Sequence, residues 1–496
     1  MKNSITYLDE KSIRRIAENI ENTAAEFCTC PDSLTEFVLF VKNQVLELGR
    51  IIIRETLSGI NQALCDSPDR KEDWLVKKHD TRKVLTSLGE VEFAHTLFEG
   101  KNGQGSRYLL DELIGLEPSR RILEDAVANI LEEAAATSYR SGGNRACEGE
   151  PVSPQTVKNI IHGLAFPQEE KPAFKKAVRF LYIEADEDHI ALQFQNRKGD
   201  LARDENGRKN NTVAGKIVYV HEGLEKDSPG GKRRHLVNAH YFGGLYSGEE
   251  NKKLWEEVFQ YIDDHYDLGA IEKIYLGADG GTWIQGADSA IPGICIALDE
   301  FHLSKYLLKM TAFLQDSAYD ARQDLKKTIR ENDRKSFDRL VKKTEGYCET
   351  ESGKKRIAES ADYIRSNWEA AMVRLCREDG LVGCSAEGHV SHVFSSRMSS
   401  RPMGWSRTGV EKMCRLRVYI KNGGNVLELA KYQKSAGAED LPEAAGAEGL
   451  SSSAILRSEK NRHPGVGKYV EAVMAEVSPV IASQCWYKGL MKSFTW

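Results

Sequence analysis

The order of strand and helix patterns after residue 178 constrains the fold of this chain more than any other feature. Runs rich in β-branched and aromatic residues predict strands, and apolar residues at helical spacing predict one helix between them. The predicted order is 178–195 as two adjoining strands, 216–223 as a third strand, 248–266 as a helix, and then 273–281 and 293–302 as strands. Strands that surround a helix in this order predict an α/β domain with a mixed sheet.

Length and charge limit what the rest of the chain can be. With 496 residues the chain is long enough for roughly three domains. The net charge of −5 is close to neutral, so a nucleic-acid surface would have to come from local clustering of basic residues. No run of about 18 apolar residues predicts a membrane span, and the start of the chain lacks the apolar core of a secretory signal. The ten cysteines include no Cys-x-x-Cys pair, so we expect reduced thiols and a cytoplasmic protein.

A helical pattern precedes the α/β region and resembles a helix-turn-helix. A helix over 111–147 is expected to stop at Ser-Gly-Gly-Asn (141–144), and a short second helix starts near Ser153. Gln155, Thr156 and Lys158 would lie on that second helix, where such side chains can reach base edges and phosphates. Short helix pairs that only pack together are the alternative interpretation.

Acidic residues at the ends of predicted strands are the candidate catalytic groups. Glu184, Asp186 and Asp188 alternate along one strand and would share a face, which favours a divalent cation as their counter-charge. The alternative is a solvent-facing strand edge that resists aggregation. Asp279 follows another strand, where open α/β sheets place ligands, although Asp-Gly is also a common turn.

A third acid would complete a metal site, and the sequence offers Asp299, Glu300 and Glu387. Glu387 opens a segment rich in His, Ser and Arg, which suits a site that faces phosphate. A glutamate at the start of a helix is also favoured by the helix dipole alone.

Four sequence blocks together resemble the ISLre-type insertion-sequence transposases of bacteria, which are relatives of the Mutator-like DDE transposases. The blocks are EADEDHIALQ, YLGADGGTWI, LDEFHLSKYL and SAEGHVSHVFSSRMSSRPMGWS. The resemblance implies an α/β, ribonuclease-H-like catalytic core with a mixed sheet and a helical insertion, preceded by a mostly helical N-terminal DNA-binding region. It also implies an Asp-x-x-His motif, which here is Asp299 to His302.

By position, the resemblance assigns the three catalytic acids and a metal. Asp186 matches the first acid, Asp279 the second and Glu387 the third, while Glu184 and Asp188 compete with Asp186 for the first role. Two Mg²⁺ ions, which Mn²⁺ can replace, would be held by these carboxylates and would support cleavage and transfer of DNA strands. His302 and Lys305 would orient the scissile phosphate, and a structural role at a strand–helix corner is the alternative for His302.

Basic and aromatic residues supply the predicted DNA contacts. Arg397, Arg401 and Arg407 follow Glu387 closely and would grip the phosphate backbone. Trp283 would either stack on an unpaired base or belong to the core. The expected partners are double-stranded DNA, as terminal inverted repeats and as target, and further copies of the chain bound to that DNA.

The same interpretation divides the chain into seven segments. They are a helical N-terminal region (1–80), a small β-hairpin unit (81–115), a helix-turn-helix-like DNA-binding region (116–170), the first part of the catalytic core (171–302), a helical insertion (303–380), the last part of the core with the third acid (381–434), and a linker with a C-terminal helix (435–496). A ribonuclease-H-like nuclease or resolvase without strand transfer, and a domesticated DNA-binding regulator, are the alternatives for function.

Overall fold

The computed structural model describes residues 10–31, 33–101, 103, 105–194, 211–231 and 233–438. The chain divides into two compact units. The first holds the described residues up to Val157 and those from Val426 onward, and the second is Lys158–Asn425. The predicted linker and C-terminal helix after residue 438 lie outside the described residues. No helix in the described ranges combines the length and the apolar character that crossing a membrane requires.

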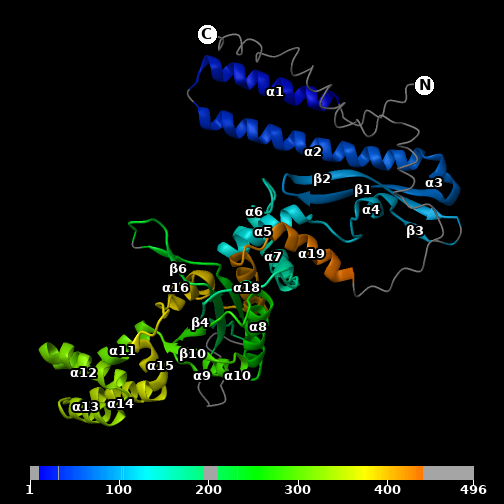
Figure 1. Cartoon of the computed structure of the whole chain (residues 1–496). Coiled ribbons are helices and arrows are strands. Elements are labelled where there is room, and N and C mark those ends of the chain that lie inside the picture. Colours follow the sequence, from blue (N-terminus) through cyan, green and yellow to red (C-terminus); the bar gives the residue numbers. More distant parts are fainter. Residues whose placement is uncertain are drawn as a thin grey trace. The chain divides into compact units, whose positions relative to one another are not determined.

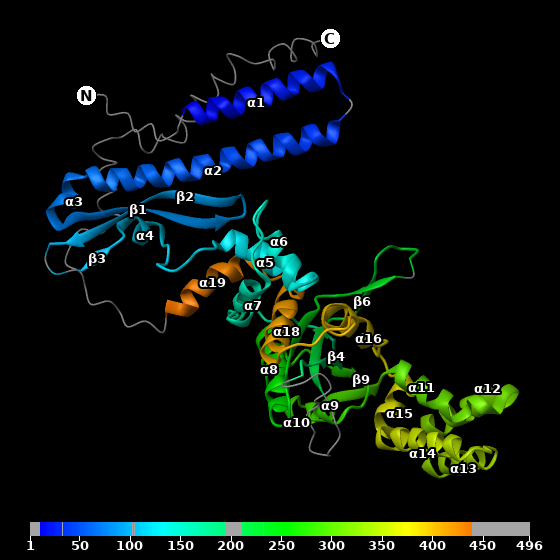
Figure 2. The same ribbon diagram turned by 180° about the vertical axis from the view of Figure 1, so that it is seen from behind.

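A β-hairpin packed against a long helix forms the first part of unit one (Figures 1 and 2). The hairpin begins at Trp74, whereas the sequence placed its start at residue 81, because strand pairing continues to the Trp74–Gly100 pair. Leu64, Val84, Phe93 and Phe98 are buried between the helix and the hairpin. The elements are α1 (Glu10–Thr29), α2 (Leu34–Asp66), α3 (Pro68–Asp73), β1 (Trp74–Thr86), β2 (Gly89–Gly100), β3 (Ser106–Arg107) and α4 (Leu109–Ile114).

Short helices complete unit one. They are α5 (Glu124–Ala136), α6 (Tyr139–Arg145), the first turn of α7 (Pro154–His162) and α19 (Val426–Ala438). The expected stop at 141–144 is wrong, since α5 ends at Ala136 and these four residues lie inside α6. A side chain at Gly143 would place its Cβ 2.0 Å from the carbonyl oxygen of Val152, so glycine here permits close packing and does not end a helix.

The second unit is built on a mixed sheet that has five strands in the described residues, in the order β10-β9-β4-β5-β8. β4 pairs antiparallel with β5 and parallel with β9, so β4 lies in the middle of the sheet. β8 is antiparallel to β5, and β10 is parallel to β9. The strands are β4 (Phe180–Ala191), β5 (Thr212–His221), β8 (His240–Gly244), β9 (Lys273–Ala278) and β10 (Ile294–Leu298).

Two strand predictions need correction. Residues 178–195 were expected to form two strands, but a single strand, β4, runs continuously through the acidic motif. The third antiparallel strand is therefore β8, which the sequence pattern did not predict. A small hairpin, β6 (Leu224–Lys226) with β7 (Arg234–Leu236), precedes it.

Helix α8 (Glu250–His265) covers one face of the sheet, as its apolar face predicted. Leu254, Trp255, Val258 and Ile262 of α8 pack with residues of β4, β5 and β9 in one buried cluster. Trp283 joins this cluster at its edge, with its ring 5.8 Å from that of Trp255, which supports a core role for it over base stacking. Two short helices, α9 (Thr282–Gln285) and α10 (Ala287–Ala290), lead from β9 to β10.

A helical insertion follows β10 and has a core of its own (Figure 1). Leu303, Leu307, Phe337, Ile364 and Trp368 are among its buried residues. Its elements are α11 (Glu300–Thr311), the 3₁₀ helix η1 (Ala312–Ser317), α12 (Ala318–Arg330), α13 (Arg334–Gly346), α14 (Glu351–Ser366) and α15 (Trp368–Cys376).

The chain returns from the insertion to the face of the sheet opposite α8. Phe394 and Cys414, from this returning part, approach Gly215 of β5. The elements are α16 (Ala386–Val390), the π-helical turn η2 (Ser391–Ser395), α17 (Ser396–Met398) and α18 (Arg407–Lys421). The boundary predicted at residue 434 is therefore displaced, because α19 belongs to unit one.

Candidate acidic site at the strand ends

Three aspartates meet at one edge of the mixed sheet, where parallel strands β9 and β10 end beside β4. Ala185 of β4 pairs with Ala278 of β9, so Asp186 and Asp279 are the next residues along these neighbouring strands. Leu298 of β10 also pairs with Ala278, and the Asp299 N–H donates to the Ala278 carbonyl at 2.8 Å. The carboxyl ends of parallel strands are where open α/β sheets place ligands.

The electrostatics of Asp186 show which predicted residues come together. The pKa of Asp186 is raised to about 7, mainly by burial and in addition by the charges of Asp279 and Glu387. A hydrogen bond from the Glu187 N–H (2.8 Å) and the charge of His302 act in the opposite direction. All three of the other predicted catalytic side chains therefore act on this one carboxyl group.

Asp279 lies in a turn that is fixed by the helical insertion. Its Oδ1 accepts a hydrogen bond from the Gly281 N–H at 2.9 Å. Its backbone carbonyl accepts one from the Tyr363 hydroxyl of α14. Gly280, at φ +83°, lies against the side chain of Asn367, which is itself buried between α14 and α15.

Asp299 and His302 form an ion pair at the first turn of α11. Asp299 is the N-cap residue, and its Oδ2 lies 3.1 Å from His302 Nδ1. The hydrogen bond with Asp299 raises the pKa of His302, while burial opposes that shift. Burial raises the pKa of Asp299, but the hydrogen bonds from His302 and from the Phe301 N–H outweigh burial and lower it. Asp299 therefore orients His302 beside Asp279.

Glu184, Asp186 and Asp188 face the same returning segment, but they differ in their surroundings. Glu184 is buried and accepts hydrogen bonds from Tyr219 and Ser385. Asp188 accepts one from the Ser399 hydroxyl at 2.9 Å. Asp186 is half-buried and accepts a hydrogen bond from the neighbouring Glu187 N–H. Among the three, Asp186 has the surroundings that suit a group facing a ligand.

The carboxylate oxygens suit a hard divalent cation, although the side chains in the described ranges are not close enough together to coordinate one. Asp186, Asp279 and Glu387 offer carboxylate oxygens, which Mg²⁺ prefers. The charges of Asp279 and Glu387 act on Asp186, and a bound cation would offset that repulsion. Within the described ranges, however, no set of three His, Cys, Asp or Glu side chains is gathered so that it could hold a metal. Glu387 is exposed on α16.

The predicted phosphate contacts near the site fall into two groups. Lys305, Arg401 and Arg407 are exposed, as a surface contact requires. Arg397 is only 4% exposed, and its guanidinium lies over the Trp405 ring at 4.7 Å. The expectation that Arg397 grips the DNA backbone does not match its position, because its charge is enclosed by protein.

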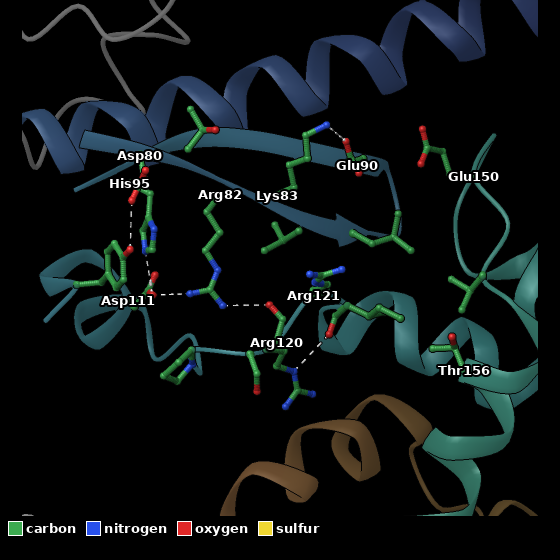
Figure 3. A pocket seen from close by; sticks show the side chains of 18 of the residues that line it. Asp80, Arg82, Lys83, Glu90, His95, Asp111, Arg120, Arg121, Glu150 and Thr156 are labelled. Carbon is green, nitrogen blue, oxygen red and sulfur yellow. Dashed lines mark hydrogen bonds and ion pairs between the residues drawn. The ribbon is translucent and has the colours of Figure 1, made fainter. Parts of the chain in front are cut away.

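The predicted base contacts lie on α7, and Thr156 borders a cavity of unit one (Figure 3). Gln155 is exposed, and Thr156 and Lys158 are half-buried. The cavity, of about 890 Å³, also includes Arg82 and Lys83. These two cations form ion pairs with Asp111 and Glu90, so their positive charges are balanced.

Sequence reasoning missed several residues that build the site. Tyr363, Asn367 and Arg374 all come from the insertion, which the sequence described only as charged helices. Arg374 is 8% exposed and donates to the carbonyls of Leu298 (2.7 Å) and Val382 (2.6 Å). A single arginine among many in charged helices gives no local signal that it will be buried.

These features define a mixed α/β protein with an acidic site at the ends of its central strands and a helical insertion within the core. The chain belongs to the uncharacterised protein family UPF0236, whose model matches residues 32–435. The UPF0236 protein TTE2489 of Caldanaerobacter subterraneus subsp. tengcongensis is 36% identical over 402 residues, which cover 80% of each chain. Another UPF0236 protein of that bacterium, named by eleven loci, is 33% identical over 398 residues and again covers 80% of each chain. Many such copies in one bacterium are typical of mobile-element proteins.

One solved structure with a weak likeness is the Drosophila P element transposase strand transfer complex. The TM-score is 0.23 at 10% identity, with 69% of this chain and 85% of that chain covered. A likeness of this size does not establish a common fold.

Proposed function

We propose that this protein is a DNA transposase of a bacterial insertion sequence, which cleaves and transfers DNA strands by a DDE mechanism. The observation that supports this most is that Asp279 and Glu387 both lie near enough to Asp186 for their charges to act on it. These acids come from three separate parts of the chain, and the charges of the other two both raise the pKa of Asp186. A partly buried carboxyl group with two further acids nearby is costly to ionise without a ligand, so this placement suggests a functional site.

The topology of unit two supports a ribonuclease-H-like core. Three antiparallel strands are followed by a helix and two parallel strands, and β4, which bears Asp186, lies in the centre. The helical insertion lies between β10 and α16, before the third acid. The multiplicity of UPF0236 proteins within one bacterium agrees with an element that copies or moves itself.

Each residue then has a part in the reaction. Asp186, Asp279 and Glu387 would hold Mg²⁺, which supplies charge neutralisation and activation of water for phosphodiester cleavage. His302, held by Asp299, is oriented to donate a hydrogen bond to a phosphate oxygen near Asp279. Lys305 lies one turn further along α11 and adds positive charge. Arg401 and Arg407 offer exposed cations to the DNA backbone.

The test is a cleavage and strand-transfer assay that uses the DNA flanking the gene as the element ends. With Mg²⁺, the wild-type protein should cut these ends and join them to target DNA. Asp279→Asn should abolish both reactions while end binding remains. Asp288→Asn, an exposed aspartate of the nearby helix α10, is the matched control and should remain active.

The alternatives predict different results in the same assay. Cleavage without any joined product, even from a pre-cut end, would identify a nuclease or resolvase. Specific binding without cleavage would identify a regulator. Full activity of Asp279→Asn would refute the assignment of the acids.

A further inference from the structure

The segment that returns from the insertion is held in place by hydrogen bonds from side chains to its backbone carbonyls. The Tyr275 hydroxyl donates to the Asp379 carbonyl, and the Tyr182 hydroxyl donates to the Gly380 carbonyl, both at 2.6 Å. Arg374 then donates to the Val382 carbonyl at 2.6 Å. Contacts of this kind fix the path of an irregular segment, because each of these carbonyls would lose its partner if the segment moved.

Glu184 of β4 holds the end of this segment, at Ser385. Its Oε2 accepts hydrogen bonds from the Ser385 N–H at 2.6 Å and from the Ser385 hydroxyl at 3.1 Å. Tyr219 also donates to this oxygen, and His221 Nε2 lies 3.3 Å from Oε1. The residue is 2% exposed. A buried carboxylate is stable only with such a set of partners, so the side chain has little freedom to serve as a ligand elsewhere.

The position of this carboxylate links two of the proposed catalytic acids. Glu184 precedes Asp186 by two residues on the same strand face. Ser385 is the N-cap residue of α16 and precedes Glu387 by two residues. The bond between Glu184 and Ser385 therefore joins the two backbones directly beside the two acids.

A second contact holds the other end of α16. His389 Nδ1 lies 2.8 Å from the Tyr241 hydroxyl, and its ring is 4.7 Å from the ring of Tyr219. Tyr219 therefore contacts both ends of α16, because its hydroxyl bonds Glu184 and Ser385 and its ring packs against His389. The helix that bears Glu387 is thus held at its start and at its fourth residue.

We propose that Glu184 is a positioning residue, which holds the Ser385 end of α16 on β4 and thereby sets Glu387 near Asp186. This inference rests on the proposed function, because it assigns Glu387 to the reaction. It also corrects the alternative in which Glu184 is itself the first catalytic acid, since the carboxylate of Glu184 is enclosed by its partners.

The first test measures the position of α16 without any catalysis. Hydrogen–deuterium exchange of the full chain should show faster exchange in peptides covering 385–395 in Glu184→Gln, by about tenfold or more. Peptides of α8 should exchange as in the wild type. Glu256→Gln, an exposed glutamate of α8, is the matched control and should leave residues 385–395 unchanged. Unchanged exchange of this segment in Glu184→Gln would overturn the proposal.

The second test separates turnover from DNA binding. Glu184→Gln should lower the rate of strand transfer about ten- to hundredfold, because a bond to a charged acceptor is weakened, while the Kd for the DNA end stays within about twofold. It should also raise the Mg²⁺ concentration for half-maximal rate, which loss of a distant structural contact would not do. A wild-type rate together with wild-type Mg²⁺ dependence would overturn the proposal.

Ser385→Ala decides the matter if Glu184→Gln fails to fold. It removes the hydroxyl bond and keeps the backbone bond, so a milder form of the same changes is expected, about two- to tenfold in rate. Wild-type behaviour of Ser385→Ala in exchange and rate would then count against the proposal. If the wild-type protein neither cuts nor joins DNA, the proposed function fails, and the exchange experiment still decides whether Glu184 holds α16.

Discussion

Gly280 lies between the Asp279 turn and Asn367 of the helical insertion, so Gly280→Ala should disturb both. A Cβ at this position would lie 2.2 Å from Asn367 Oδ1 and 2.6 Å from its Cγ. Alanine at φ +83° costs about 1–2 kcal/mol in backbone strain. Asn367 is 9% exposed and bonds the Tyr363 carbonyl, so displacing it adds about 1–3 kcal/mol. The expected loss of stability is about 2–5 kcal/mol.

Equilibrium unfolding in urea, together with the strand-transfer rate, would measure this effect. Asn367→Ala removes the atoms that the new methyl group would meet, and alone it should cost about 1 kcal/mol for its lost hydrogen bond. The double variant Gly280→Ala/Asn367→Ala should recover about 1–3 kcal/mol relative to the sum of the single effects, since the clash disappears and the backbone strain stays. Stability losses that simply add, or a Gly280→Ala protein as stable as the wild type, would refute the packing argument.

Three further predictions follow from the buried and exposed charges. Asp299→Asn should lower the Tm most between about pH 4 and pH 7. Because the pKa of His302 is raised, its contribution to stability is complete at low pH and is lost as the pH rises through that pKa. Because the pKa of Asp299 is lowered, its contribution is lost as the pH falls through that pKa. Tm curves of the wild type and the variant that differ by a constant amount from pH 3 to pH 9 would contradict this. Arg374→Ala should cost about 2–5 kcal/mol in urea unfolding, because two buried carbonyls lose their partner, whereas Arg377→Ala should cost little. Arg401→Ala and Arg407→Ala should each reduce the salt slope of DNA binding by about one, and Arg397→Ala should not; equal slopes for all three would argue against our distinction between exposed and buried arginines.

Local patterns predicted the elements whose burial follows from their own sequence. Helix α8 and strands β5, β9 and β10 lie within or close to their predicted ranges. The spacing of their apolar residues is enough to predict which face is buried. Strand β8 escaped prediction since His240–Gly244 is short and ends in two glycines. It is a strand because β5 offers an edge to pair with and α18 packs beside it.

In the candidate site too, local patterns predicted some residues, while contacts between distant segments could not be predicted. The sequence named Asp186, Asp279, Glu387 and His302, and the structure places the last three near enough to Asp186 for their charges to act on it. The resemblance favoured Asp186 for the first acid, but the residue pattern alone left Glu184 and Asp188 as competitors, because the partners that enclose Glu184 lie far along the chain, at Tyr219 and Ser385. Arg397 was misjudged for a similar reason, since its burial depends on the fold of the Trp405 segment.

The insertion contributes to the site as well as interrupting the core. Tyr363 bonds the carbonyl of Asp279, and Asn367 packs against Gly280, so the second acid rests on the junction of α14 and α15. Arg374, from α15, bonds both the end of β10 and the segment that leads to Glu387. The segments that bear Asp279 and Glu387 thus share one support, because Tyr363 bonds the Asp279 carbonyl and Arg374 bonds Val382 in the segment that leads to Glu387. A chain that brings distant carboxylates together against their mutual repulsion needs such a rigid support, and here the insertion provides it.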